Sequence, residues 1–207
     1  MGTVNSIVTK ARRKLSDTAS ARWSDADMVA FAQEAVERME MTLAKFDIQF
    51  AKERATIETV ASQDYISLPD DFLSDKGLFR AATNTALTKK NEDGWERIIS
   101  AGELTNYIIL GDKIYLKGTP STAENLTLHY YTTHDTSAWT DATMGTDTTP
   151  WGGKCDTIIV WYMTLVAANV DGMDWSADQS LMNDLERRVF ETYGTLGTLA
   201  DESEGWL

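Results

Sequence analysis

The sequence predicts an α+β fold in which N- and C-terminal helices form a bundle and a β-rich middle is inserted between them. Three patterns support this prediction. Apolar residues recur at helical spacing over residues 24–50, alternate with period two in segments between residues 53 and 131, and become continuous over residues 158–168. We therefore expect a helical body (1–52 and 150–207), a β-rich insertion (53–149) and a single structural unit.

The first fifty residues are expected to form two helices. Residues 3–16 place apolar side chains near i, i+3, i+4 spacing. Ser24 is the predicted N-cap of the second helix, with Asp25 and Asp27 favourably placed in its first turn. The stripe along this second helix is apolar and is typical of a core face: Met28, Phe31, Ala35, Met39, Leu43, Phe46 and Phe50.

Several segments of the middle have the period of a strand. Residues 55–60 alternate, residues 65–72 form a short strand stopped by Pro69, and residues 78–82 are a further candidate. Residues 126–131 place every second residue, beginning with Leu126, on one face of a strand. Residues 100–104 could form one helical turn.

A β-hairpin is expected around Gly111-Asp112, because two apolar runs flank this two-residue loop and glycine tolerates the positive φ that such a loop requires. Residues 133–150, which are rich in Thr, Asp and Gly, predict a long polar loop that is mobile or ordered by a partner.

The segment Ile158–Ala168 is apolar on every side, so a helix there must be covered by protein or membrane. Its eleven residues fall short of the roughly 20 needed to cross a bilayer, so we expect a core or a subunit interface and no membrane association. Pro150 and Asp156 are plausible start signals, and the helix should end near residues 169–172. A last helix should begin at the capping box Ser176/Gln179 and stop at Gly194.

The net charge of −13 is unevenly distributed along the chain. Residues 1–22 carry +4, whereas residues 171–207 carry −7. An acidic body repels phosphate, which disfavours gripping DNA, while the basic start could dock on an acidic neighbour or form a solvated helix face. The single cysteine, Cys155, excludes an intramolecular disulfide, and residues 1–20 lack the apolar core of a signal peptide.

A search for catalytic chemistry predicts no catalytic, cofactor-binding or metal-binding residue. His129 and His134 lack a metal-ligand motif, and Gly152-Gly153-Lys154 lacks the first glycine and the hydroxyl residue of a phosphate loop. Acids are plentiful and could form a general acid/base pair or a Ca²⁺ cluster, although turn and cap roles explain them more simply: Asp70, Asp71 and Asp75, and Asp171, Asp174 and Asp178.

In their order along the chain, several of these segments resemble the head-to-tail adaptor (connector, head-completion) proteins of tailed bacteriophages. The resemblance rests on Trp23–Val29 at a helix start, Tyr65–Phe72 at a strand stop, the Leu110-Gly111-Asp112 hairpin, Tyr130-Tyr131 at a strand end and the closing pair of helices. Many relatives have a proline shortly after the Tyr-Tyr pair, whereas Thr132-Thr133-His134-Asp135 follow here, a departure from the family pattern at the start of the 133–150 loop.

This resemblance implies a non-enzymatic virion protein that binds under the portal protein as a ring of about twelve copies. The ring would extend the channel through which genomic DNA passes without sequence-specific binding, and would present a face to a downstream tail or nozzle protein. Assembly would occur in the host cytoplasm, without cofactors.

Trp206 and Leu207, which follow an acidic stretch, are predicted to anchor in a groove of a partner; the alternative is a frayed terminus. A second hypothesis for the whole chain is a virion-associated protein that binds or hydrolyses glycans through acidic residues of the β-rich middle. A third is a monomeric interaction domain of the cytoplasm.

Overall fold

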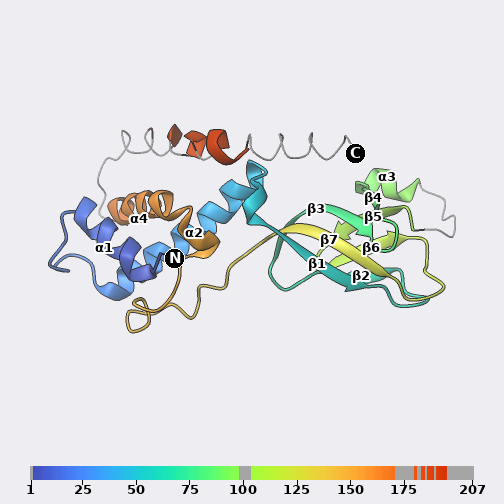
Figure 1. Ribbon diagram of the computed structural model, residues 1–207, viewed down its shortest axis with the longest axis horizontal. Helices are drawn as coiled ribbons and strands as arrows, with labels where there is room; N and C mark the ends of the chain where they lie inside the picture. The colour runs from blue at the N-terminus through green and yellow to red at the C-terminus, as the bar shows by residue number, and fades with distance from the viewer. Residues whose placement is uncertain are drawn as a thin grey trace. The chain divides into compact units, whose positions relative to one another are not determined.

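The computed structural model describes residues 2–97, 104–170, 180, 183–184, 186–188 and 190–194. The chain divides into two compact units, Met1–Ala51 with Thr133–Leu207, and Lys52–Thr132. The first, here called the helical unit, holds the longer helices, and the second, the sheet unit, holds the strands (Figure 1). That both act as a single structural unit stays a prediction.

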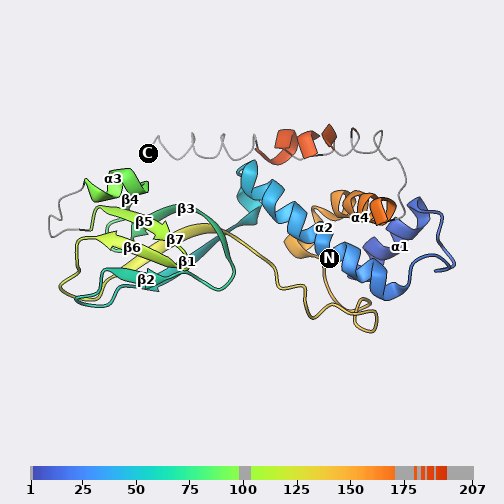
Figure 2. The same cartoon turned by 180° about the vertical axis from the view of Figure 1, so that it is seen from behind.

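The helical unit is built from α1 (Val4–Lys14), α2 (Asp25–Lys45) and α4 (Asp156–Val170), with short turns at η1 (Gln49–Ala51), η2 (Pro150–Gly153) and η3 (Phe190–Gly194). Both views show α4 beside α1 and α2 (Figures 1 and 2). Ser24 and Asp27 form a reciprocal capping box at the start of α2, which confirms the predicted N-cap. The bounds of α4 confirm the predicted start at Asp156, and the helix is described as far as Val170.

The core of the helical unit combines the apolar faces of α1 and α2 with nearly every side of α4. Met28, Ala35, Met39 and Leu43 of the predicted α2 stripe are buried. Ile159, Tyr162 and Met163 of α4 are also fully buried. The all-apolar helix α4 is therefore covered largely by α1 and α2 of the same chain.

The sheet unit is a mixed sheet of seven strands in the order β1-β7-β3-β4-β5-β6-β2. All neighbouring strands are antiparallel except β4 and β5. Its elements are β1 (Lys52–Glu58), β2 (Tyr65–Ser67), β3 (Phe72–Arg80), β4 (Thr85–Lys89), α3 (Glu92–Glu96), β5 (Asn106–Leu110), β6 (Lys113–Lys117) and β7 (Asn125–Thr132). Leu126, Leu128 and Tyr130 face one core, and Gly111 takes a φ of +61° in the predicted hairpin, so both of these predictions are confirmed.

The predicted architecture, a helical bundle with a β-rich insertion, is wrong, although the α+β class agrees in part. The described residues form a seven-stranded mixed sheet with few helices, and this sheet has its own buried core. The physical reason is that β1 pairs with β7 and β2 with β6, which are contacts between distant segments that local periodicity does not reveal. In addition, β4 buries only Leu87 and carries no alternating pattern.

The segment 133–149 is held by the helices of its own unit. The carbonyl oxygens of Asp147 and Met144 accept hydrogen bonds from the backbone N–H groups of Val4 and Asn5, at 2.9 and 2.8 Å. Gln33 Nε2 donates to the carbonyl of Thr136 at 2.7 Å. This loop is therefore ordered by α1 and α2 and does not require a partner for its order.

Candidate functional site

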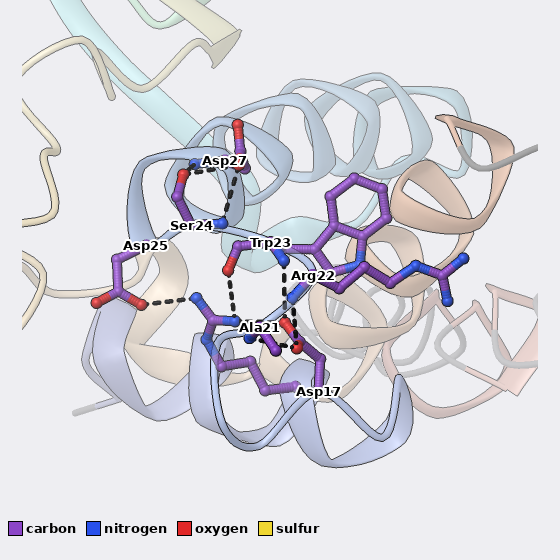
Figure 3. A network of polar contacts seen from close by, with 8 residues as sticks. Asp17, Ala21, Arg22, Trp23, Ser24, Asp25 and Asp27 are labelled. Atoms are coloured by element: carbon purple, nitrogen blue, oxygen red, sulfur yellow. Dashed lines mark hydrogen bonds and ion pairs between the residues drawn. The ribbon is translucent and has the colours of Figure 1, made fainter.

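The connection between α1 and α2 is organised around the buried side chain of Arg12, and Figure 3 labels residues of this connection, among them Asp17 and Trp23. Its guanidinium donates to Asp17 Oδ2 at 2.7 Å, to the carbonyl of Trp23 at 2.9 Å and to Asp25 Oδ1 at 2.7 Å. One side chain of α1 thus binds the connection and the first turn of α2. A planar guanidinium suits this arrangement because it directs several donors at once.

Asp17 binds the other side of the same connection. Its carboxylate accepts hydrogen bonds from the backbone N–H groups of Ala21, Arg22 and Trp23, at 2.9, 3.0 and 3.2 Å. Burial acts to raise the pKa of Asp17, but these N–H groups and the charge of Arg12 outweigh it and hold the pKa below 3.8. The connection is therefore a fixed surface of the helical unit, held by an ionised carboxylate.

Residues 183–194, where described, pack against α2 and α4. The ring centroids of Phe46 and Phe190 lie 5.2 Å apart, and those of Phe50 and Tyr193 lie 5.1 Å apart. The hydroxyl of Tyr162 donates to Glu186. Burial raises the pKa of Glu186, and the charges of Arg38 and Lys45 oppose this shift only in part. Two aromatic pairs and one partly buried carboxyl group therefore attach this segment.

Two of the three acids of the sheet unit that were considered for catalysis are engaged in structural hydrogen bonds. Asp71 accepts from Tyr130 Oη at 3.0 Å and from Thr132 Oγ1 at 2.7 Å. Asp75 accepts from Tyr107 Oη at 2.8 Å and pairs with Lys89. Burial, followed by the hydrogen bond and charge of Asp71, raises the pKa of Tyr130 to about 12. These contacts hold the ends of strands together, and Asp70 is exposed.

The two histidines occupy separate units and have structural contacts. His129 on β7 lies with its ring 4.9 Å from that of Phe79, and burial together with Arg54 and Lys52 lowers its pKa. His134 places its backbone N–H 2.6 Å and its Nδ1 3.0 Å from Oε1 of the buried Glu40. Among the described residues, no group of three or more His, Cys, Asp or Glu could hold a metal ion.

The turn at Gly152-Gly153-Lys154 is unsuited to phosphate. Trp151, Gly152 and Gly153 all adopt positive φ. A Cβ at Gly2 or at Gly153 would lie 2.0 or 3.1 Å from Asp156 Oδ2, so a carboxylate already lies beside this turn. Burial raises the pKa of the nearby Cys155 thiol to about 12, which leaves it unreactive.

Several predicted residues lie outside the described part of the chain. These include Trp206 and Leu207, the acids Asp171, Asp174 and Asp178, the capping box Ser176/Gln179, and most of the predicted turn at residues 100–104. No helix in the described ranges is both long and apolar enough to span a membrane.

Sequence reasoning missed the role of Arg12, although a signal was present. Arg12 lies next to Ala11 and between Val8 and Leu15 on the apolar side of the first helix, where a charged residue is unexpected. A charge in such a position needs partners from the neighbouring connection, and Asp17 is the first acid after it. The spacing could therefore have indicated the pair.

In these arrangements the polar groups described above are committed to structural bonds within the chain. The sequence also matches the family model of the SU10 adaptor protein over residues 3–189. Because this match covers most of the chain, the protein belongs to the SU10 adaptor family, a family of structural head-to-tail adaptors of bacteriophage virions. The resemblance inferred from the sequence is confirmed. A search of curated proteins found no match.

Proposed function

We propose that this adaptor docks under the portal protein as a ring of about twelve copies, extends the DNA channel and offers an attachment face to a downstream tail or nozzle protein. The family match over residues 3–189 is the observation that carries the proposal. Assembly would take place in the host cytoplasm, and the protein would act by docking, without catalysis.

The surface of the helical unit supports a role in assembly. Met41, Val170 and Phe190 are large apolar side chains exposed by 66, 65 and 41%. Side chains of this kind are enriched where subunits meet. A ring subunit would cover them with a neighbouring copy or with the portal.

The charge of the chain suits a conduit for DNA. At −13 per copy, a ring repels phosphate and gives DNA little reason to adhere to its wall. We therefore expect DNA to pass without sequence-specific binding. Retention of duplex DNA by the purified ring at physiological salt would contradict this part of the proposal.

The ring is tested by measuring the mass of the purified full chain by light scattering over a wide range of concentration, with the same fractions imaged by negative stain. Closed rings of about a dozen copies are expected. A chain that remains monomeric at every concentration would contradict autonomous ring formation.

A further inference from the structure

The solvent-facing side of α1 is basic. The residues of α1 that face the core include Ile7, Val8 and Ala11, whereas Lys10 and Arg13 are exposed. These two cations are three positions apart, so they lie on the same face of the helix. Lys14 is already committed, because its Nζ lies 3.3 Å from the centroid of the Trp161 ring.

The solvent-facing side of α2 is acidic over its middle. Glu34 and Glu37 are exposed, whereas Ala35, Val36 and Met39 are buried. Three positions separate the two acids, as they separate Lys10 and Arg13. The same face continues one turn further to Met41, which is exposed by 66%. This side of α2 therefore combines two carboxylates with an uncovered apolar side chain, and the exposed Arg38 beside them is committed to the Tyr162 ring, with its Cζ 4.6 Å from the ring centroid.

Neither charged pair finds a partner within the part of the chain that the structure describes. No hydrogen bond or ion pair there involves the side chains of Lys10, Arg13, Glu34 or Glu37. Each pair lies on the side of its helix opposite the buried face, so the two pairs point away from their shared core. Both pairs are therefore available for contact with another copy.

We propose that Lys10 and Arg13 of one copy dock against Glu34 and Glu37 of the next copy. The two pairs match in sign and in spacing, since three residues of helix rise about 4.5 Å on either side. The contact joins different surfaces of the two copies, so it is heterologous and propagates around a ring. Complementary charges at such a contact set its register and its orientation. This inference rests on the proposed ring.

The test uses two charge-reversed chains. K10E/R13E makes both faces acidic, and E34K/E37K makes both faces basic. Each alone should associate at least roughly tenfold more weakly than wild type, because like charges then meet at every contact. An equimolar mixture should form rings again, with the two variants alternating. The quadruple variant, which has the net charge of wild type, should also form rings.

Mass by light scattering and negative-stain images report all of these states. Circular dichroism should match wild type, because the four side chains are exposed. Ring formation by wild type should weaken between about 0.05 and about 0.5 M salt, as expected for charged contacts. Two matched controls in the sheet unit, K90E/R97E and E92K/E96K, carry the same changes in net charge and should assemble as wild type does.

The outcomes separate this inference from the proposed function. Rings that persist unchanged in both reversed chains would overturn the contact and leave the ring intact. Loss of rings without rescue by mixing would also overturn the contact, because opposite charges would then face each other without restoring assembly. Equal loss in the controls would overturn it too, because net charge would then be the cause. A wild-type chain that never assembles would overturn autonomous ring formation and, with it, the contact.

Discussion

At the scale of single residues, the buried charge of Arg12 holds the connection between α1 and α2 in place. Its guanidinium satisfies two carboxylates and one carbonyl, and its side chain is only 7% exposed. Because buried charges are tolerated only when they are paired, the residues that complete the network are interdependent. The α1–α2 connection, including the positive φ of Ser16 and Ser20, therefore depends on one side chain of α1.

Replacing Arg12 with methionine should lower the free energy of unfolding by about 3 kcal/mol, because Asp17 is then buried without its cation. Denaturant unfolding followed by circular dichroism measures the change. Arg188→Met, at an exposed arginine of the same unit, is the control and should stay within about 0.5 kcal/mol of wild type. Equal effects of both variants would show that the network contributes no special stability.

Asp17 adds a dependence on pH. Since its pKa in the folded protein is below 3.8, its contribution to stability is present above that value and is lost as the pH falls through the folded pKa. Asp17→Asn should be less stable than wild type at neutral pH, and the two should converge in acid. Unfolding curves recorded from neutral pH downwards measure this. The same difference in stability between the two proteins at every pH would contradict the lowered pKa of Asp17.

At the scale of elements, the attachment of residues 183–194 to α2 depends on protonation. Burial raises the pKa of Glu186 above its ordinary 4.5, so folding favours the neutral form of this carboxyl group more than solvent does. The aromatic pairs Phe46–Phe190 and Phe50–Tyr193 have no such dependence. Acidic conditions should therefore strengthen the attachment of residues 183–194 to the rest of the helical unit.

Glu186→Gln should remove that dependence. In wild type, the contribution of Glu186 is fully present below its unfolded pKa and is lost as the pH rises through its folded pKa. The variant keeps a neutral side chain, so it should resist limited proteolysis in this segment at neutral pH better than wild type does. Indistinguishable cleavage rates of the two chains between about pH 4 and pH 8 would refute the expectation.

At the scale of the whole molecule, membership of the adaptor family implies interaction with portal and tail components, and Trp206 with Leu207 is our proposed anchor. Both lie outside the described residues. Burial of two large apolar side chains contributes about 1.5–3 kcal/mol each before the cost of ordering the chain. An anchor of this kind would act on portal binding independently of the contact between copies.

Deletion of residues 201–207 should weaken binding to the portal of the same phage and leave ring formation unchanged. The double substitution Trp206→Ala/Leu207→Ala should reproduce the effect, whereas neutralising the three acids Asp201, Glu202 and Glu204 should not. Co-sedimentation with the isolated portal measures the affinity. Unaltered binding by the deletion variant would remove the anchor hypothesis.

Much of the secondary structure could be predicted because its signals are local. The Ser24 cap, the Gly111 loop and the alternation of Leu126, Leu128 and Tyr130 each depend on nearby residues, and each is confirmed. The short helix α3 and the polar strand β4 were missed, because neither carries an apolar period. For the site, the basic character of residues 1–22 was visible, but the role of Arg12 in the network was not recognised.

The sequence by itself determined the family, the main helices, the hairpin and the distribution of charge, because these depend on residue identity and short spacing. Only the tertiary structure decided that the strands form one seven-stranded sheet with its own core, since β1 meets β7 across more than sixty residues of chain. The tertiary structure also decided which charges are used internally, Arg12 with Asp17, and which remain on the surface, Lys10 and Arg13. That division depends on which side of a helix the core covers, and packing alone decides it.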